Sequence, residues 1–411
     1  MSAQGILMII IGLVVFNFII ESLLELINLR HQPQLLPDEL KGISNEYTFS
    51  KAQLYHAVNT NFALFRSLIT TVVVIAVFYS GMLGEIAMFT SDIDAHKYVQ
   101  YLIFLAIVFG GSNLFSLPFS LYQTFVIEKK FGFNKTTVPL FISDRIKSFI
   151  ITAVIGSIIL LVFFFALDWL GENFWWIFWL FMSLFMLVAT VFFSSWILPL
   201  FNKLVPLEEG ELKTAITEYT TKVNFPLENI YVMDGSKRSS KSNAFFTGMG
   251  RKKKIVLYDT LIKNHTTEEL VAILAHEVGH YKKKHILKGY IVSIIQTGVI
   301  LFVLSRFIFS KELSIALGAK DYFLPLNIIS LGVLFSPLSM MIGIVMNAWS
   351  RKNEYEADRY ASNTYGGVHL AKSLIKLSSD NLVNLTPHPW YVFVHYSHPP
   401  IIDRIKLLRK L

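Results

Sequence analysis

Long apolar stretches recur about seven times along this chain, each of roughly 20 residues or more. A segment of that length can cross the hydrocarbon core of a bilayer as an α-helix. The stretches lie near 5–29, 63–89, 98–127, 148–170, 173–200, 286–310 and 326–349. Backbone groups inside a membrane must pair within their own segment, which favours helices. The sequence therefore predicts an all-α multi-span membrane protein.

The composition agrees with a membrane location and limits the chemistry. Hydrophobic residues make up 53% of the 411 residues, and the mean hydropathy is +0.51. The chain has no cysteine, so disulfides, thiolate ligands and a cysteine nucleophile are excluded, and any metal must be held by histidine and carboxylate. The net charge of +8 comes mainly from residues between and after the apolar stretches, so we expect no nucleic-acid partner.

Basic residues between the stretches predict the orientation. If the spans alternate, three basic segments fall on one side of the membrane, and the positive-inside rule makes that side cytoplasmic. They are the connection 129–147 after the third stretch, residues 251–254, and the tail from Arg351 and Lys352. We expect the N-terminus outside and the C-terminus inside, and we interpret the first apolar stretch as a retained span.

Residues 204–285 differ in composition from the apolar stretches around them and are too long for a simple connector. Their pattern predicts a helix over 211–223 and short strands over 230–233, 243–247 and 254–258. We therefore expect a small α+β insert. The predicted division is residues 1–203 with five membrane helices, 204–285 with the catalytic insert, 286–350 with two more helices, and 351–411 as a C-terminal helical segment.

The motif HEVGH, residues 276–280, lies on a predicted helix that begins with the capping pair Thr266 and Glu269. His276 and His280 are four residues apart, so both imidazoles project from one face and can reach one zinc ion. Glu277 lies about a third of a turn from His276. It is placed to act as general base towards a water molecule beside the metal.

A catalytic zinc needs a third protein ligand. The long motif HExxHxxGxxH is excluded because position 286 is Ile286, and His285 lies about half a turn from the ligand face. Downstream, Glu354 and Asp358 share a helix face, so Glu354 can be the third ligand while Asp358 supports a ligand imidazole. Glu356 points to the opposite side, and we expect it to be solvated. The prediction is a single zinc ion per chain.

These motifs resemble those of the type I CAAX prenyl proteases, which are multi-span zinc metalloproteases of the gluzincin type. The likeness covers nearly the whole chain and includes HEVGH, NEYEAD at 353–358, FGFNKTT at 131–137, DGSKRSSKSNAFFTG at 234–248 and YSHPPIIDRI at 396–405. The resemblance implies seven helices around an intramembrane chamber, with the zinc towards the cytosolic end. It also implies that the substrate is a prenylated C-terminal peptide and the partner a lipid bilayer.

Carried over by position, the resemblance implies that His276, His280 and Glu354 bind zinc and that Glu277 is the catalytic carboxylate. It further implies that Asn243 contacts the substrate backbone, and that His398 and Arg404 are active-site groups.

Each of the last three residues also has a physical interpretation. A strand at 243–247 on a sheet edge could add the peptide as a further strand. His398 precedes two prolines that keep the backbone extended, so it could donate to an oxyanion. We hypothesise that Arg404 pairs with Asp358.

Two alternatives stay open. One is a quality-control zinc protease of broad specificity, and the other is a transport or translocation protein with a structural metal. Where eukaryotic members tend to have histidine before Ser-Asn-Ala, this chain has Lys241, as in bacterial forms. The expected location is accordingly either a bacterial inner membrane or the endoplasmic reticulum.

Overall fold

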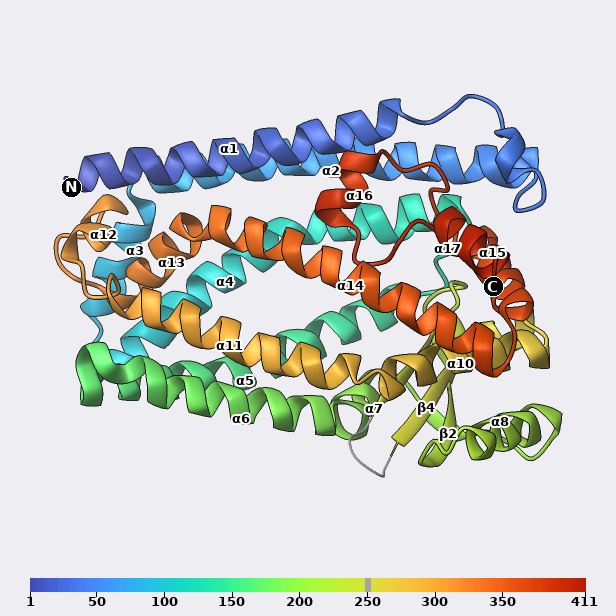
Figure 1. Ribbon diagram of the computed structural model, residues 1–411. Coiled ribbons are helices and arrows are strands. Elements are labelled where there is room, and N and C mark those ends of the chain that lie inside the picture. Colours follow the sequence, from blue (N-terminus) through green and yellow to red (C-terminus); the bar gives the residue numbers. More distant parts are fainter. Residues whose placement is uncertain (248–252) are drawn as a thin grey trace.

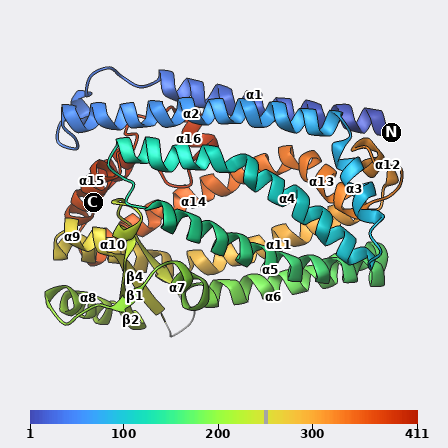
Figure 2. The ribbon, with the colours of Figure 1, turned by 180° about the vertical axis from the view of Figure 1, so that it is seen from behind.

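The computed structural model describes residues 1–247 and 253–411, and long helices run side by side along its length (Figures 1 and 2). The N- and C-termini lie at opposite ends of this bundle. The long helices are α1 (Ala3–Arg30), α2 (Glu46–Tyr79), α4 (Lys97–Tyr122), α5 (Val138–Leu170), α6 (Phe174–Phe192), α11 (His285–Ser305) and α14 (Ser336–Thr364).

The number of possible membrane crossings agrees with the sequence pattern. Among the described residues, five helical segments are long and apolar enough to span a membrane, or six if α13 (Leu324–Leu334) and α14 count as one bent span. One of these segments, Val138–Phe192, contains both α5 and α6. The two helices lie side by side and are joined by the turn η3 (Gly171–Asn173), where Gly171 has a φ of +53° (Figure 1). With the hairpin counted as two, about seven crossings result, as predicted.

The prediction of one continuous span over 63–89 was wrong. Helix α2 ends at Tyr79, and Met82–Ser91 forms a separate helix, α3. Between them Gly81 has a φ of +72°, a conformation that glycine adopts without the strain of a Cβ atom. Apolar residues continue through this turn, so hydropathy alone does not register the break.

The seventh predicted span, 326–349, is also interrupted. Helices α13 and α14 meet at a bend of 51°. Pro337 lies in the first turn of α14, where its missing N–H costs no helical hydrogen bond. Helix α14 then continues to Thr364, so one helix carries the chain from the apolar stretch into the segment that contains Glu354 and Asp358.

Shorter elements join and cap the long helices. They include η1 (Asp38–Leu40), the π-helical segments η2 (Gln123–Glu128) and η4 (Phe193–Ile197), α7 (Leu198–Phe201), η5 (Gly235–Lys237), α12 (Lys311–Ala316), α15 (Gly367–Asp380), α16 (Pro389–His395) and α17 (Ile401–Leu408).

The buried side chains of the bundle are concentrated at its two ends. One buried cluster gathers near the N-terminus around Ile10, Phe104 and Phe174, and a second gathers at the opposite end around the HEVGH helix. Only 6% of the apolar part of α2 is buried. The chain exposes 21316 Å², against about 16,000 Å² for a compact monomer of its mass. This excess surface agrees with the chamber that the family resemblance implies.

A four-stranded sheet forms the centre of the α+β part, with the strand order β1-β2-β4-β3. The strands are β1 (Leu204–Pro206), β2 (Leu227–Met233), β3 (Ala244–Thr247) and β4 (Lys253–Tyr258). The pair β2 and β4 is parallel, the other two pairs are antiparallel, and β3 lies at an edge. The three predicted strands and the predicted helix, now α8 (Glu211–Lys222), are all present. The three-residue strand β1 was not predicted.

We predict that Gly84→Ala destabilises the end of the bundle near the N-terminus. A Cβ atom at Gly84 would lie 2.1 Å from the carbonyl carbon and oxygen of Gly318, so backbone must move. Overpacking of this kind costs about 1–3 kcal/mol. The matched control is Gly156→Ala, because nothing lies within 4 Å of a Cβ atom there. Thermal midpoints in detergent should fall for Gly84→Ala alone, and equal midpoints would contradict the packing argument.

Candidate active site

The HEVGH motif lies on α10 (Thr267–Lys282), which begins as the sequence predicts. The Thr266 side chain accepts from the backbone N–H of Glu269, and the Glu269 carboxylate accepts from the backbone N–H of Thr266, completing the capping box. The apolar face of α10 is almost fully buried, with Val271, Ala275 and Val278 at 0% exposure. This burial fixes the face that carries the histidines against the rest of the α+β part.

Helix α10 crosses α14 in close contact one turn from the histidines. A Cβ atom at Gly279 would lie 3.0 Å from the Cα atom and 3.1 Å from the carbonyl oxygen of Ala357. Glycine at this position therefore lets the two helix backbones approach each other. The contact brings the HEVGH face of α10 against the face of α14 that carries Glu354 and Asp358.

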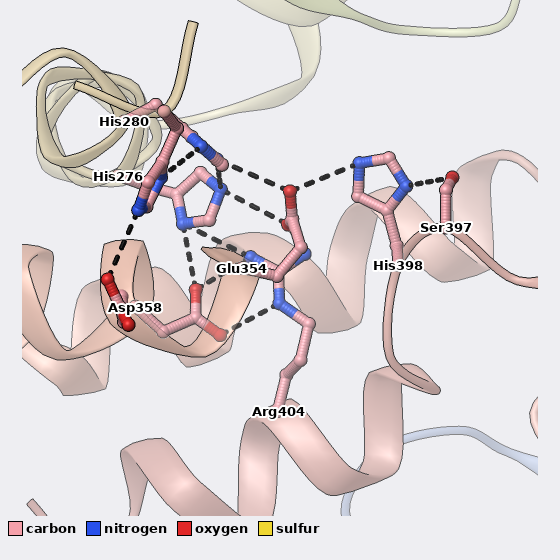
Figure 3. Close-up of polar contacts among 9 residues, drawn as sticks. His276, His280, Glu354, Asp358, Ser397, His398 and Arg404 are labelled. Carbon is pink, nitrogen blue, oxygen red and sulfur yellow. Dashed lines mark hydrogen bonds and ion pairs between the residues drawn. The ribbon is translucent and has the colours of Figure 1, made fainter. Parts of the chain in front are cut away.

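His276, His280 and Glu354 meet at this crossing, as the motif spacing predicted (Figure 3). The two Nε2 atoms are 3.1 Å apart, and the Glu354 oxygens lie 3.3 Å from Nε2 of His280 and 3.4 Å from Nε2 of His276. Ligand atoms around a tetrahedral zinc, at about 2.0–2.2 Å from the metal, are separated by about 3.3–3.5 Å. The two carboxylate distances are to different Glu354 oxygens; with one ligand atom taken from each residue, the three atoms lie within 4.8 Å of one another, close enough to hold one zinc ion.

Glu354 supplies a second indication that a metal belongs here. It is 4% exposed, and its Oε2 atom is buried with no hydrogen-bond partner among the described residues. Nε2 of His276 and Nη1 of Arg404 lie 3.4 Å from this oxygen without forming a hydrogen bond to it, and a bound cation would satisfy it more fully. The nitrogen and oxygen donor set also suits zinc. These residues therefore fit a zinc ion and leave its fourth position without a protein ligand.

Each candidate ligand imidazole is held by a further side chain. The Nδ1 atom of His276 lies 2.8 Å from Oδ1 of Asp358, and Nδ1 of His280 lies 3.0 Å from Nδ1 of His285. His285 in turn places its Nε2 atom 3.2 Å from the Glu356 carboxylate. Such outer contacts fix the tautomer and orientation of a ligand histidine.

The contacts of His285 and Glu356 were not predicted. The side chain of Glu356 is 31% exposed, in line with the expected solvation, and its carboxylate also contacts buried His285 across the turn between α10 and α11. Helical geometry excluded His285 as a ligand on the face of α10. The sequence predicted a membrane helix from residue 286, but it could not show that the first residues of this helix return the His285 ring towards His280.

Arg404 binds the carboxylates behind the metal ligands. It donates from Nε and Nη2 to the two oxygens of Asp358, at 2.8 and 2.7 Å, and its Nη1 lies 3.4 Å from Oε2 of Glu354 (Figure 3). The geometry agrees with the hypothesised pair with Asp358. Burial alone would lower the pKa of Arg404, but the two carboxylates raise it above its usual value. A substrate contact of Arg404 stays a prediction.

The charge balance also affects His276. Burial and the positive charge of Arg404 lower the pKa of this imidazole, but the hydrogen bonds to Asp358 and Glu354 outweigh them and raise it to about 9. At neutral pH, a zinc ion that binds Nε2 of His276 therefore has to displace a proton.

The metal-binding group borders a cavity of about 420 Å³. Glu277, which is half-buried, lines it beside the histidines, and the edge strand β3 lines it with Ala244, Phe245 and Phe246. Asn243 lies just before β3 and is exposed at the cavity. Apolar residues of α15 line another part of the wall.

His398 comes to the same cavity from the C-terminal segment. Its Nε2 atom lies 3.4 Å from Oε1 of Glu354, and its Nδ1 atom is 3.0 Å from the hydroxyl of Ser397 (Figure 3). Its side chain is 65% exposed, unlike those of the metal-binding group. Seven of the eight predicted site residues therefore line this cavity, and the eighth, Asp358, is fully buried behind it in contact with His276 and Arg404, while their individual roles stay predictions.

The segment before β3 is held from two sides. Lys241 places its Nζ atom 3.1 Å from the Glu128 carboxylate and donates to the Tyr55 hydroxyl at 2.8 Å. On the other side, the Asn381 side chain accepts from the backbone N–H of Ser242 and donates to its carbonyl, at 3.2 and 3.3 Å. The lysine that departs from the eukaryotic pattern therefore ties β3 to the helical bundle.

The bundle of apolar helices, the HEVGH helix and Glu354 as the third metal-binding residue together define an integral-membrane zinc metallopeptidase. Family models match along most of the chain: "CAAX prenyl protease N-terminal, five membrane helices" over residues 25–203 and "Peptidase family M48" over residues 206–411. The chain belongs to peptidase family M48 and, within it, to the CAAX prenyl protease 1 type, so the resemblance found in the sequence is confirmed.

Curated relatives and a solved structure are similar over almost their full lengths. CAAX prenyl protease 1 of Saccharomyces cerevisiae is 34% identical, covering 92% of this chain and 88% of that protein. The CAAX prenyl protease 1 homolog of Homo sapiens is 31% identical, covering 92% and 89%. The crystal structure of S. mikatae Ste24p has a TM-score of 0.93 and 33% identity, and covers 98% of this chain and 99% of that one.

We predict that zinc binding releases a proton from His276. Since its pKa lies near 9, the imidazole is protonated below that pH in the zinc-free protein. Zinc affinity should therefore rise with pH by up to about tenfold per unit until pH 9, and fall as pH drops. Calorimetry at pH 7.5 in buffers of different ionisation enthalpy counts the released protons.

Asp358→Asn provides the comparison for this experiment. Without the Asp358 carboxylate, the pKa of His276 should be lower, so zinc should release fewer protons at pH 7.5 than in the wild type. Equal proton release by the two proteins would show that Asp358 does not control the protonation of His276.

Proposed function

We propose that this membrane zinc endopeptidase cleaves CAAX-type prenylated C-terminal peptides at the cytosolic side of the membrane. The observation that carries the proposal is the position of the catalytic cavity, at one end of a bundle of long apolar helices. A lipid-modified terminus has an apolar chain and a polar peptide side by side, and this end of the molecule offers both environments. The names of the relatives supply the substrate class.

The proposed orientation follows from the basic segments. The N-terminus lies outside and the C-terminus inside, so that α10, the sheet and the C-terminal helices are cytosolic. In this arrangement residues 204–285 and 351–411 form the catalytic part, and residues 1–203 and 286–350 form the membrane part. Of the basic segment 251–254, residues 251 and 252 lie outside the described residues.

The substrate binds along β3 in this proposal. Among the described strands, β3 pairs with β4 alone, so the backbone groups on its other side are available to an extended peptide in this proposal. Backbone pairing does not depend on side chains, which suits C-terminal peptides of varied sequence. Asn243 is placed at the start of this edge to contact the peptide backbone.

When bound to His276, His280 and Glu354, zinc polarises the scissile carbonyl and makes a neighbouring water acidic. Glu277 takes a proton from that water and passes it to the nitrogen of the leaving amine. The exposed imidazole of His398 donates a hydrogen bond to the carbonyl oxygen as negative charge develops there. Asp358 holds the His276 ring in the tautomer with a free Nε2 lone pair.

The ligand set favours an enzyme over a protein with a structural metal. Structural zinc sites are normally closed by four protein ligands, whereas three ligands leave room for water or substrate. Here two histidines and one glutamate converge, and the open side borders the cavity. This ligand set therefore argues against the alternative of a transport or translocation protein with a structural metal.

We predict that Glu277→Gln abolishes peptide cleavage but retains zinc. General-base catalysis contributes about 10²–10⁴-fold to the rate, and an amide cannot take the proton. Glu277 is not among the metal-binding group, so zinc content should be unchanged. The measurement is peptide cleavage with metal analysis of the same samples. Wild-type rates in the variant would exclude Glu277 as the base.

We also predict a preference for prenylated substrate. Matched peptides with and without a C-terminal farnesyl cysteine should differ at least about tenfold in kcat/KM, because each buried CH₂ group contributes about 0.8 kcal/mol. Mass spectrometry locates the cleaved bond, which should lie next to the prenyl cysteine. Equal cleavage of the two peptides would instead indicate the quality-control alternative, a membrane protease of broad specificity.

A further inference from the structure

Four lysines lie within seven residues at the junction of α10 and α11. They are Lys282, Lys283, Lys284 and Lys288 in the sequence KKKHILK, residues 282–288. Helix α11 follows at once and is apolar and long enough to cross a membrane. The lysines therefore lie where a membrane helix enters the water phase. Clusters of this kind next to a membrane helix are typical of contact with anionic lipid headgroups.

A second cavity, of about 440 Å³, lies at this junction and is separate from the catalytic cavity. Its wall includes Lys282 at the end of α10, Lys284 just before α11, Ile286 and Leu287 at the start of α11, and Leu187 on α6. Figure 1 shows α6 and α11 running side by side up to this region. The cavity thus joins a cationic rim to an apolar wall built by two membrane helices.

The two parts of the wall face different environments. Ile286 and Leu287 are 50% and 48% exposed, so two apolar side chains are open at the start of a helix that is apolar and long enough to span a membrane. Lys282 is exposed and donates from Nζ to the backbone carbonyl of Asn224 at 3.1 Å, a contact with a neutral group that leaves its charge uncompensated. Among the described residues, no acidic side chain lines this cavity.

The apolar wall is held in a defined shape. The Tyr290 hydroxyl donates to the backbone carbonyl of Ser183 at 2.8 Å and so joins α11 to α6. Tyr290 also lines the cavity, and tyrosine is enriched at the level of lipid headgroups because it combines an apolar ring with a polar hydroxyl. The cavity is therefore a feature of the packed helices and not a gap between loose side chains.

We propose that this cavity binds an anionic phospholipid. Its headgroup lies between Lys282 and Lys284, and its acyl chains follow Leu187, Ile286 and Leu287. Charge complementarity and the apolar wall both support this ligand. A free phosphate ion would use only the lysines, and a lipid without net charge would gain little from them.

The lipid site adjoins the catalytic machinery. Lys253, Tyr281 and Ile286 line both cavities, and the lysine-rich rim is the end of the helix that carries His276 and His280. A lipid bound at this rim therefore holds α10 at the level of the headgroups. If the proposed function holds, α10 then lies at the same depth as a substrate peptide whose lipid anchor is in the same leaflet.

Native mass spectrometry of the detergent-solubilised full chain tests the proposal. The protein is titrated with phosphatidylserine and with phosphatidylcholine of identical acyl chains, and phosphatidylserine should bind at least tenfold more tightly. Since each lysine near a headgroup contributes about fivefold, Lys282→Gln combined with Lys284→Gln should weaken phosphatidylserine binding about 25-fold. The double arginine variant at the same positions should retain binding.

The matched control replaces two exposed lysines outside the cavity, Lys263 and Lys410, by glutamine. This control should bind phosphatidylserine like the wild type. Equal binding of the two lipids, or unchanged binding by the glutamine variant of Lys282 and Lys284, would overturn the proposal. Displacement of phosphatidylserine by millimolar inorganic phosphate would also overturn it, because the cavity would then recognise phosphate without the lipid.

Discussion

The site depends on two carboxylates of α14 that are buried where this helix crosses α10. Glu354 is 4% exposed and Asp358 is 0% exposed, and both face α10. An isolated buried carboxylate costs several kcal/mol, so this crossing is stable only with positive partners. Arg404 supplies one charge through a bidentate contact, and the imidazoles with their metal supply the rest. The same electrostatic requirement therefore fixes the fold at this point and creates the catalytic centre.

Arg404 also explains why the C-terminal segment is part of the enzyme. Helix α17 has to pack beside α14 for the guanidinium to reach Asp358, and this places the preceding residues Ser397 and His398 at the cavity. The position of His398 at the cavity thus depends on the ion pair between Arg404 and Asp358. On the opposite side, Lys241 and Asn381 hold the segment before β3, so both walls of the cavity are tied to helices of the bundle and the C-terminal part.

The bundle has two packed ends, and only one of them carries the zinc site. Packing is concentrated at the two ends, and the spans between them leave much of their surface exposed. The N-terminal end closes through tight contacts such as Gly84 against Gly318, whereas the other end carries the zinc site and the sheet. The lysine-rich cavity also lies at this second end, beside the C-terminal end of the catalytic helix α10.

The sequence by itself determined the membrane class, the α+β insert and the zinc chemistry. These follow from local properties: apolar length, strand alternation, and the four-residue spacing that puts His276 and His280 on one helix face. Glu354 was also within reach, because a third ligand was required and Glu354 and Asp358 share one face of a helix in the segment NEYEAD.

Only the tertiary structure decided the break at Gly81, the bend before α14, and the contacts of His285 with His280 and Glu356. It likewise decided that Lys241 pairs with Glu128 on a distant helix. The physical reason is that these features depend on close approach between separate segments, and no periodicity along the chain records which backbones or charges will meet.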